Sequence, residues 1–150
     1  MTAISEFRNV LRDTVKMWET TGNKNAGMIE RVVYTIGIDC ISQSLPSKYK
    51  SGRPNACFMN TSMVVHRHKN LRYCEGFACR IGFSYPIHHA WAIDGENRVI
   101  DVTWTDPEKG VYIGVPFTYK EWDDYTGINS ASIFDTGRGL NIQILERLLK

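Results

Sequence analysis

The chain has no apolar run approaching the ~20 residues that a membrane-spanning helix needs. Residues 1–16 also lack the apolar core of a signal peptide, because Glu6, Arg8, Arg12 and Asp13 place charges through their centre. These absences predict no membrane partner and, by default, a cytoplasmic location. Internal repeats and low-complexity segments are lacking too, which argues against a repeat architecture.

The chain carries no large excess of either charge. Its formal net charge is +2, and the basic stretch of Lys48, Lys50 and Arg53 is interpreted as a solvated loop, so we predict no nucleic-acid partner. With 150 residues, 43% of them hydrophobic, the chain can bury one core without a second domain. We therefore expect a single domain over residues 1–150, and the oligomeric state is left open.

The cysteines are even in number, but the chain lacks the export signal and the small size of a disulfide-stapled domain. A disulfide-stapled domain is usually smaller, so we expect reduced thiols at the four positions. These are Cys40, Cys57, Cys74 and Cys79.

A zinc-binding module is one alternative for part of this set. Cys74 and Cys79 have four residues between them in the sequence, and a pair of histidines could join them to form a tetrahedral site. The two candidate pairs are His88 with His89, and His66 with His68.

The first part of the chain has helical periodicity. Apolar residues spaced for one helix face run from Ile4 to Trp18 and predict a helix that ends near residues 20–22. A second helix is predicted over residues 28–44, with a break at Gly37 as an alternative, and residues 43–55 are predicted to form a loop.

β-Branched and aromatic residues dominate the middle of the chain. Strands are predicted over residues 73–83, 87–93, 98–103 and 111–115. Two helices follow, one over residues 119–125 with Thr118 as its cap and one over residues 140–150. This order predicts an α+β fold in which N-terminal helices pack on an antiparallel sheet.

A Cys, a His and an Asp follow one another through these elements, as Cys57, His89 and Asp101. A thiol at its ordinary pKa is only slightly ionised at neutral pH, so a sulfur nucleophile needs an imidazole nearby. The imidazole in turn needs a group that holds its second nitrogen. The three residues therefore predict a nucleophile, its base and the group that orients the base.

The local sequence around Cys57 favours that role. Pro54 and Asn55 resemble the end of a loop and a helix cap, and residues 57–68 contain neither Gly nor Pro. We expect Cys57 in the first turn of a helix, where the positive end of the helix dipole favours a thiolate.

His89 and Asp101 lie in the two arms of a predicted hairpin. Residues 94–97 form a turn signal between the strands, and His89 precedes it by five residues while Asp101 follows it by four. The two are expected to face each other across the ladder within one residue of register. His88 would point to the opposite face.

These segments resemble the transglutaminase-like branch of the papain-like cysteine enzymes. The resemblance rests on Cys57 at a helix start, on the Cys-Glu-Gly-Phe-Ala run of residues 74–78, on His-Ala-Trp at 89–91, and on Asp-x-Thr at 101–103. It implies a papain/transglutaminase-like core with Cys57 as nucleophile, His89 as base and Asp101 as orienting residue. It covers residues 55–104.

The resemblance implies an amide as substrate, and nothing in the chain calls for a cofactor. Hydrolysis of a peptide or protein amide through an acyl-thioester is the first hypothesis, and deamidation or transamidation of a glutamine side chain is the second. A non-catalytic interaction domain of the same fold is a third.

Further residues are candidates for the surroundings of the predicted site. The Cys57 backbone amide is a natural oxyanion donor, and Asn55, Asn60 or Gln43 could supply a side-chain amide. Trp91 is interpreted as core in preference to a wall of the site. Two other tryptophans are assigned to the core outright, namely Trp104 and Trp122.

Overall fold

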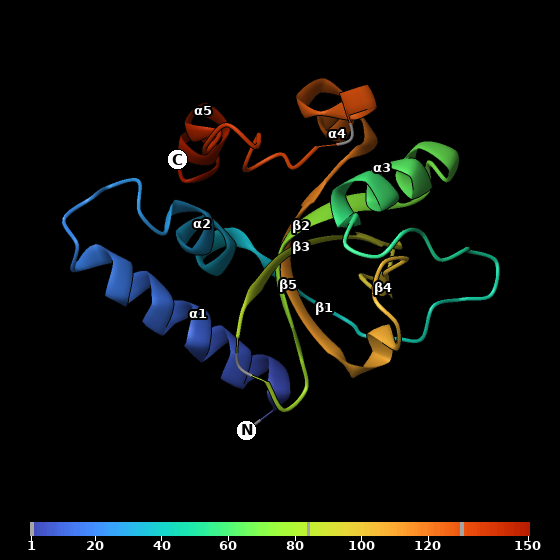
Figure 1. Ribbon diagram of the computed structural model, residues 1–150, viewed down its shortest axis with the longest axis horizontal. Coiled ribbons are helices and arrows are strands. Elements are labelled where there is room, and N and C mark those ends of the chain that lie inside the picture. Colours follow the sequence, from blue (N-terminus) through green and yellow to red (C-terminus); the bar gives the residue numbers. More distant parts are fainter. Residues whose placement is uncertain (1, 84, 130) are drawn as a thin grey trace.

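The computed structural model describes residues 2–83, 85–129 and 131–150. A curled antiparallel sheet of five strands in the order β1-β5-β2-β3-β4 lies at its centre (Figure 1). The strands are β1 (Ile38–Cys40), β2 (Arg72–Arg80), β3 (Ile87–Ile93), β4 (Val99–Ile100) and β5 (Gly110–Phe117). The helices are α1 (Ala3–Glu19), α2 (Met28–Ile36), α3 (Cys57–Arg67), α4 (Tyr119–Tyr125) and α5 (Ile142–Leu148), with 3-10 turns η1 (Pro107–Lys109) and η2 (Gly127–Asn129). The predicted mixture of helices with an antiparallel sheet is confirmed.

The two faces of the sheet bury different clusters of side chains. On one face, residues of all five helices pack with strand residues such as Phe77 and Ile113 in the larger core. On the other face, Trp91 and Tyr112 form the centre of a smaller cluster, against which Trp104 packs. Because β-strand side chains alternate between faces, β2, β3, β4 and β5 contribute to both clusters, whereas β1 contributes Ile38 and Cys40 to the smaller one.

The first helix follows its prediction closely. The hydroxyl of Thr2 accepts a hydrogen bond from the Ser5 amide and caps the helix, and Phe7, Leu11 and Val15 form its buried stripe. α1 lies beside α2 on one side of the sheet (Figure 1). The expected packing of N-terminal helices on the sheet is therefore confirmed.

The second helix is shorter than the predicted 28–44, and the alternative prediction of a break at Gly37 is confirmed. It ends at Ile36, and Gly37 has an extended backbone with ψ of 149°. A Cβ at Gly37 would lie 2.3 Å from the carbonyl oxygen of Val33, so only glycine fits at the position where the chain leaves the helix. The chain then enters β1, where Ile38 pairs with Gly114 of β5. Pairing with a distant strand thus replaces the predicted continuation of the helix.

The later elements agree better with local signals. β3 has its predicted bounds, and α4 begins at Tyr119 behind a capping box made by Thr118 and Glu121. β4 is an exception, because only Val99–Ile100 of the predicted residues 98–103 are strand.

Close approach of β2 and β5 depends on Gly76. A Cβ at this position would lie 2.3 Å from the Ile113 carbonyl oxygen and 2.5 Å from Gly114 Cα. Gly76 is paired with His89 on its other side, so this close contact sets the position of the strand that carries the histidine.

Candidate active site

Cys57 is the first residue of α3, as predicted from the sequence. The cap itself differs from the prediction. Ala56 occupies the N-cap position and makes no side-chain hydrogen bond, while Asn55 has a left-handed backbone with φ of 60°. Asparagine tolerates this conformation better than most residues, so Asn55 turns the chain into the helix instead of capping it.

His89 and Asp101 are in contact, although not as direct cross-strand partners. Nε2 of His89 lies 2.9 Å from Oδ2 of Asp101. In the β3–β4 ladder Ala92 pairs with Ile100, so extending the register by one residue would place Asp101 opposite Trp91, two residues from His89. The expected facing within one residue was therefore wrong, and the two side chains meet diagonally on the same face.

The carboxylate of Asp101 is fully buried and accepts four hydrogen bonds. The amides of Thr103 and Trp104 donate to Oδ1 at 2.9 and 3.2 Å, which turns the chain away from the ladder and explains why β4 is short. The hydroxyl of Tyr112 donates to Oδ2 at 2.8 Å. Burial opposes ionisation of Asp101, but hydrogen bonding and attraction to His89, together with these donors, lower its pKa below the ordinary value.

Tyr112 is a residue of this site that the sequence did not single out. It lies in β5, whose predicted residues 111–115 were assigned as a strand without any role in the site. Burial, followed by the charge of Asp101, raises the pKa of Tyr112 well above its ordinary value, so its hydroxyl keeps its proton and serves as a donor.

Aromatic rings surround the His89 imidazole, whose side chain is only 3% exposed. Trp104 stacks on it with ring centroids 4.5 Å apart, and Trp91 lies parallel at 6.0 Å. Trp91 is fully buried, as expected. Trp104 is half-buried: it packs against the smaller core cluster, as expected, but it also lines the cleft. The short β4 leaves the residues after it free to fold over the imidazole.

The electrostatics of His89 depend on both of its neighbours. Burial alone would lower its pKa, but hydrogen bonding to Asp101 and to Cys57, together with attraction to both, raises the pKa of His89 to about 9. Because Nε2 is engaged by Asp101, Nδ1 is the nitrogen that remains for the thiol. His89 therefore interacts with both the Asp101 carboxylate and Cys57, and it holds a proton at neutral pH.

Cys57 opens into a cleft with two halves. One half has a volume of about 550 Å³ and is lined by His89, Trp104 and Arg80. The other has a volume of about 480 Å³ and is lined by the segment that contains Ser132 and Asp135. Cys57 itself lines both halves, so an extended ligand crossing the cleft would pass over the thiol.

The three candidate oxyanion amides have different positions. Gln43 donates from Nε2 to the Val99 carbonyl at 2.9 Å and does not line the cleft. Asn55 is exposed and lines both halves of the cleft beside Cys57. Of the three side chains, Asn55 is the one placed where a developing oxyanion could be reached.

Asn60 has a structural position instead. It is 5% exposed, and its Nδ2 donates to the Arg53 carbonyl at 2.8 Å and to Thr103 Oγ1 at 3.0 Å. Both amide hydrogens are therefore used. These contacts connect the loop before Cys57 to the turn that follows Asp101. They therefore help to fix the position of the thiol relative to the carboxylate.

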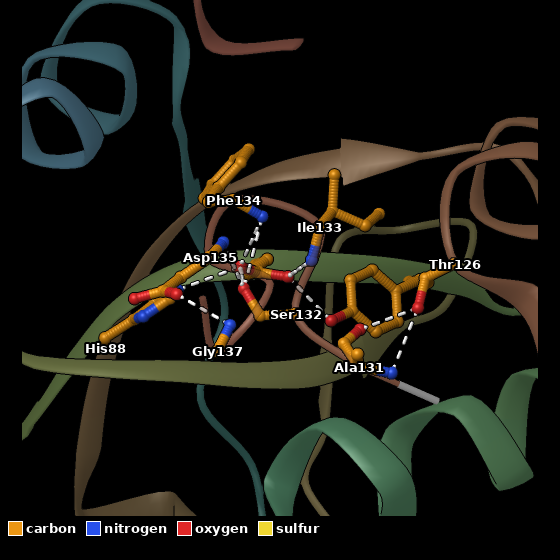
Figure 2. A network of polar contacts seen from close by, with 10 residues as sticks. His88, Thr126, Ala131, Ser132, Ile133, Phe134, Asp135 and Gly137 are labelled. Atoms are coloured by element: carbon orange, nitrogen blue, oxygen red, sulfur yellow. Dashed lines mark hydrogen bonds and ion pairs between the residues drawn. The ribbon is translucent and has the colours of Figure 1, made fainter. Parts of the chain in front are cut away.

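His88 points to the opposite face from His89, as predicted, and contacts a second buried carboxylate. Its Nε2 lies 2.8 Å from Oε2 of Glu75, which is 0% exposed. Glu75 also accepts hydrogen bonds from the Tyr73 hydroxyl at 2.7 Å, the Ser132 hydroxyl, and the amides of Ile133 at 2.8 Å and Phe134 at 3.2 Å (Figure 2). No sequence signal marked this cluster, because its members are up to 59 residues apart. These hydrogen bonds hold the segment around Ser132, which lines the half of the cleft that contains Asp135, against the sheet.

The ligands of the alternative zinc site are not brought together. Cys74 belongs to the smaller cluster on one face of the sheet, whereas Cys79 belongs to the larger core on the other. Among residues 2–83, 85–129 and 131–150, no group of three or more potential ligands could hold a metal ion. Each of the four cysteines has a free thiol.

Comparisons of the chain with protein-family models, curated proteins and solved structures found no match. Within the part of the chain that the structure describes, no helix is both long and apolar enough to cross a membrane.

Proposed function

We propose that this protein is a cysteine-dependent amide hydrolase, a peptidase or amidase, that acts through Cys57, His89 and Asp101. The observation that carries the proposal is the position of His89. It is hydrogen-bonded to a buried carboxylate on one side, it is coupled to the Cys57 thiol on the other, and it faces an open cleft.

The first step would be attack of the Cys57 thiolate on the amide carbonyl. The S–C bond forms, the C–N bond breaks, and the proton on His89 Nδ1 passes to the departing amine. The pKa of about 9 for His89 supports this role, because the imidazole carries the required proton at neutral pH. The stacked ring of Trp104 and the bond to Asp101 keep the imidazole oriented.

The second step would be hydrolysis of the acyl-thioester. Neutral His89 accepts a proton from a water molecule that attacks the thioester carbonyl, the C–S bond breaks, and the thiolate is regenerated with the imidazolium. In both steps the carbonyl oxygen develops negative charge. We assign its stabilisation to the backbone amide of Cys57, which has no partner within the helix at this first position, and to the side chain of Asn55.

We further propose a transglutaminase-like relationship for the core. The supporting features are the order of a helix that begins with the thiol, an antiparallel strand with the histidine and a neighbouring segment with the aspartate. An amine in place of water in the second step would give transamidation through the same acyl-enzyme. Hydrolysis is preferred because it requires only water as acceptor.

The test is alkylation of the native protein by iodoacetamide between about pH 5 and pH 8, followed by intact-mass measurement. We expect one fast-reacting thiol in the wild type, its loss in Cys57→Ala, and a rate at least about tenfold lower in His89→Gln at pH 6. Burial raises the pKa of Cys79 to about 11, so this thiol should react slowly and not obscure the result.

Circular dichroism of each variant provides the folding control, and His66→Gln is a matched histidine variant because His66 is exposed and outside the cleft. Equally slow labelling of wild type and His89→Gln, in folded proteins, would refute the proposed catalytic function and favour a binding role for the fold.

A further inference from the structure

The two halves of the cleft carry opposite charges. Among the described residues that line the half containing His89, Arg80 is the one permanently charged side chain. Among the described residues that line the other half, the one acidic or basic side chain apart from histidine is Asp135. A substrate lying across Cys57 would therefore meet a cation on one side of its scissile bond and an anion on the other.

The guanidinium of Arg80 is held in place without an acidic partner. Arg80 is the last residue of β2, and its Nη1 donates to the Asp106 carbonyl at 2.9 Å. The group also lies over the ring of Trp104, 5.0 Å from the ring centroid. No carboxylate among the described residues forms an ion pair with it. Its other N–H groups are thus left to bind a ligand, and a guanidinium suits a carboxylate geometrically.

The chemistry of acyl transfer orients the substrate relative to these charges. The departing amine must lie within hydrogen-bond reach of the group that protonates it. His89 lines the half-cleft that contains Arg80, and it does not line the half that contains Asp135. The amine portion of the substrate should therefore occupy the Arg80 side, and the acyl portion the Asp135 side.

We propose that Arg80 is a specificity residue that binds a carboxylate on the amine portion of the scissile amide. The inference rests on the proposed function, and it narrows the substrate to peptides or amides whose leaving group is an anionic amino acid. This carboxylate could be the α-carboxylate of a terminal residue or the side chain of an acidic residue, since both have the same chemistry.

The experiment uses thiol-reactive probes that differ in one charge. Iodoacetyl-glutamine carries an α-carboxylate, iodoacetyl-isoglutamine carries only the side-chain carboxylate, and the iodoacetylated diamide of glutamate carries neither. Each is reacted with the full-length protein at pH 7, and the rate of Cys57 alkylation is followed by intact mass. The rate for each acid divided by the rate for the diamide measures recognition of the carboxylate and cancels the intrinsic reactivity of the thiol.

In the wild type we expect one of the two acids to react about tenfold faster than the diamide. In Arg80→Gln this ratio should fall to near one, Arg80→Lys should restore part of it, and added salt should reduce it in the wild type. Arg12→Gln is the matched control, because Arg12 lies on α1 outside the cleft, and its ratio should equal that of the wild type. The acid that gains the rate identifies the source of the carboxylate.

The outcomes separate this inference from the proposed function. Fast labelling that depends on His89, with the same acid-to-diamide ratio in wild type and Arg80→Gln, would overturn the role of Arg80 and leave the catalytic proposal standing. Slow labelling by the neutral diamide, independent of His89, would overturn both. Loss of the ratio in Arg12→Gln as well would show a general charge effect and would also overturn the role of Arg80.

Discussion

Nε2 of His89 lies 2.9 Å from Oδ2 of Asp101, although the two residues are not paired in the sheet. The contact forms because the chain leaves the β4 ladder at Asp101. The carboxylate of Asp101 accepts hydrogen bonds from the backbone amides of Thr103 and Trp104, which turn the chain. An early end to one strand thus allows a carboxylate to meet an imidazole diagonally.

The stability of the protein should fall as the pH rises through the pKa of His89. That pKa is raised from 6.5 to about 9 in the folded state, so the folded state binds the proton more tightly than the unfolded state. The stabilisation is complete below about pH 6.5 and is lost as the pH approaches 9, and it corresponds to roughly 3 kcal/mol. Urea unfolding of wild type at several pH values would measure it.

His89→Gln should lose this particular pH dependence, whereas His66→Gln should keep it. Cys57→Ala should retain only part of this pH dependence, because the thiol contributes to the raised pKa of His89. A free energy of unfolding that is constant between pH 6 and pH 9 in the wild type would contradict the prediction.

Tyr112→Phe should destabilise the protein by about 1 to 2 kcal/mol, because it removes one of four donors from a buried carboxylate. The pKa of Asp101 should rise, so acid unfolding should begin at a higher pH than in the wild type. Thermal unfolding and an acid titration by circular dichroism would measure both effects. Tyr119→Phe is the control, since among the described residues its hydroxyl is hydrogen-bonded only to the exposed ring of His66, at 3.3 Å. An equal effect of the two substitutions would count against the Tyr112 contact.

Glu75→Gln should cost about 3 kcal/mol or more, because the substituted amide would turn an N–H₂ group toward donors that now bind a carboxylate. The loss should be concentrated in the segment beside Ser132. Hydrogen exchange at the amides of Ile133 and Phe134 should accelerate more than exchange in α1. Glu146→Gln, an exposed change on α5, should leave these rates unaltered. Unchanged protection of the two amides in Glu75→Gln would refute the anchoring role.

Gly76→Ala should destabilise the sheet by about 2 kcal/mol or more, since the new Cβ would overlap the Ile113 carbonyl at 2.3 Å. The shift should also disturb His89, the partner of Gly76, and slow Cys57 labelling. Gly95→Ala is the matched control because nothing lies within 4 Å of its Cβ, and it should change stability by no more than about 0.5 kcal/mol. Equal unfolding midpoints for the two variants would contradict the close approach.

Several features of the fold were determined by short stretches of sequence. The start of a helix at Cys57, the bounds of β3 and the cap at Thr118 depend on backbone preferences and on contacts three or four residues apart. The opposite directions of His88 and His89 follow in the same way from the period of a strand. Such features are local, so the sequence by itself determined them, and with them the order of the three candidate catalytic residues.

The tertiary structure decided the features that depend on strand pairing and on distant contacts. Pairing with β5 made a strand of the residues after Gly37, the position of β5 in the sheet brought Tyr112 to Asp101, and the turn after β4 placed Trp104 at the edge of the core, where it also lines the cleft. The five donors around Glu75 come from three separate segments and gave no sequence pattern. Local preferences cannot set these positions, because the free energy that selects one register comes from burial and hydrogen bonds between residues far apart in the chain.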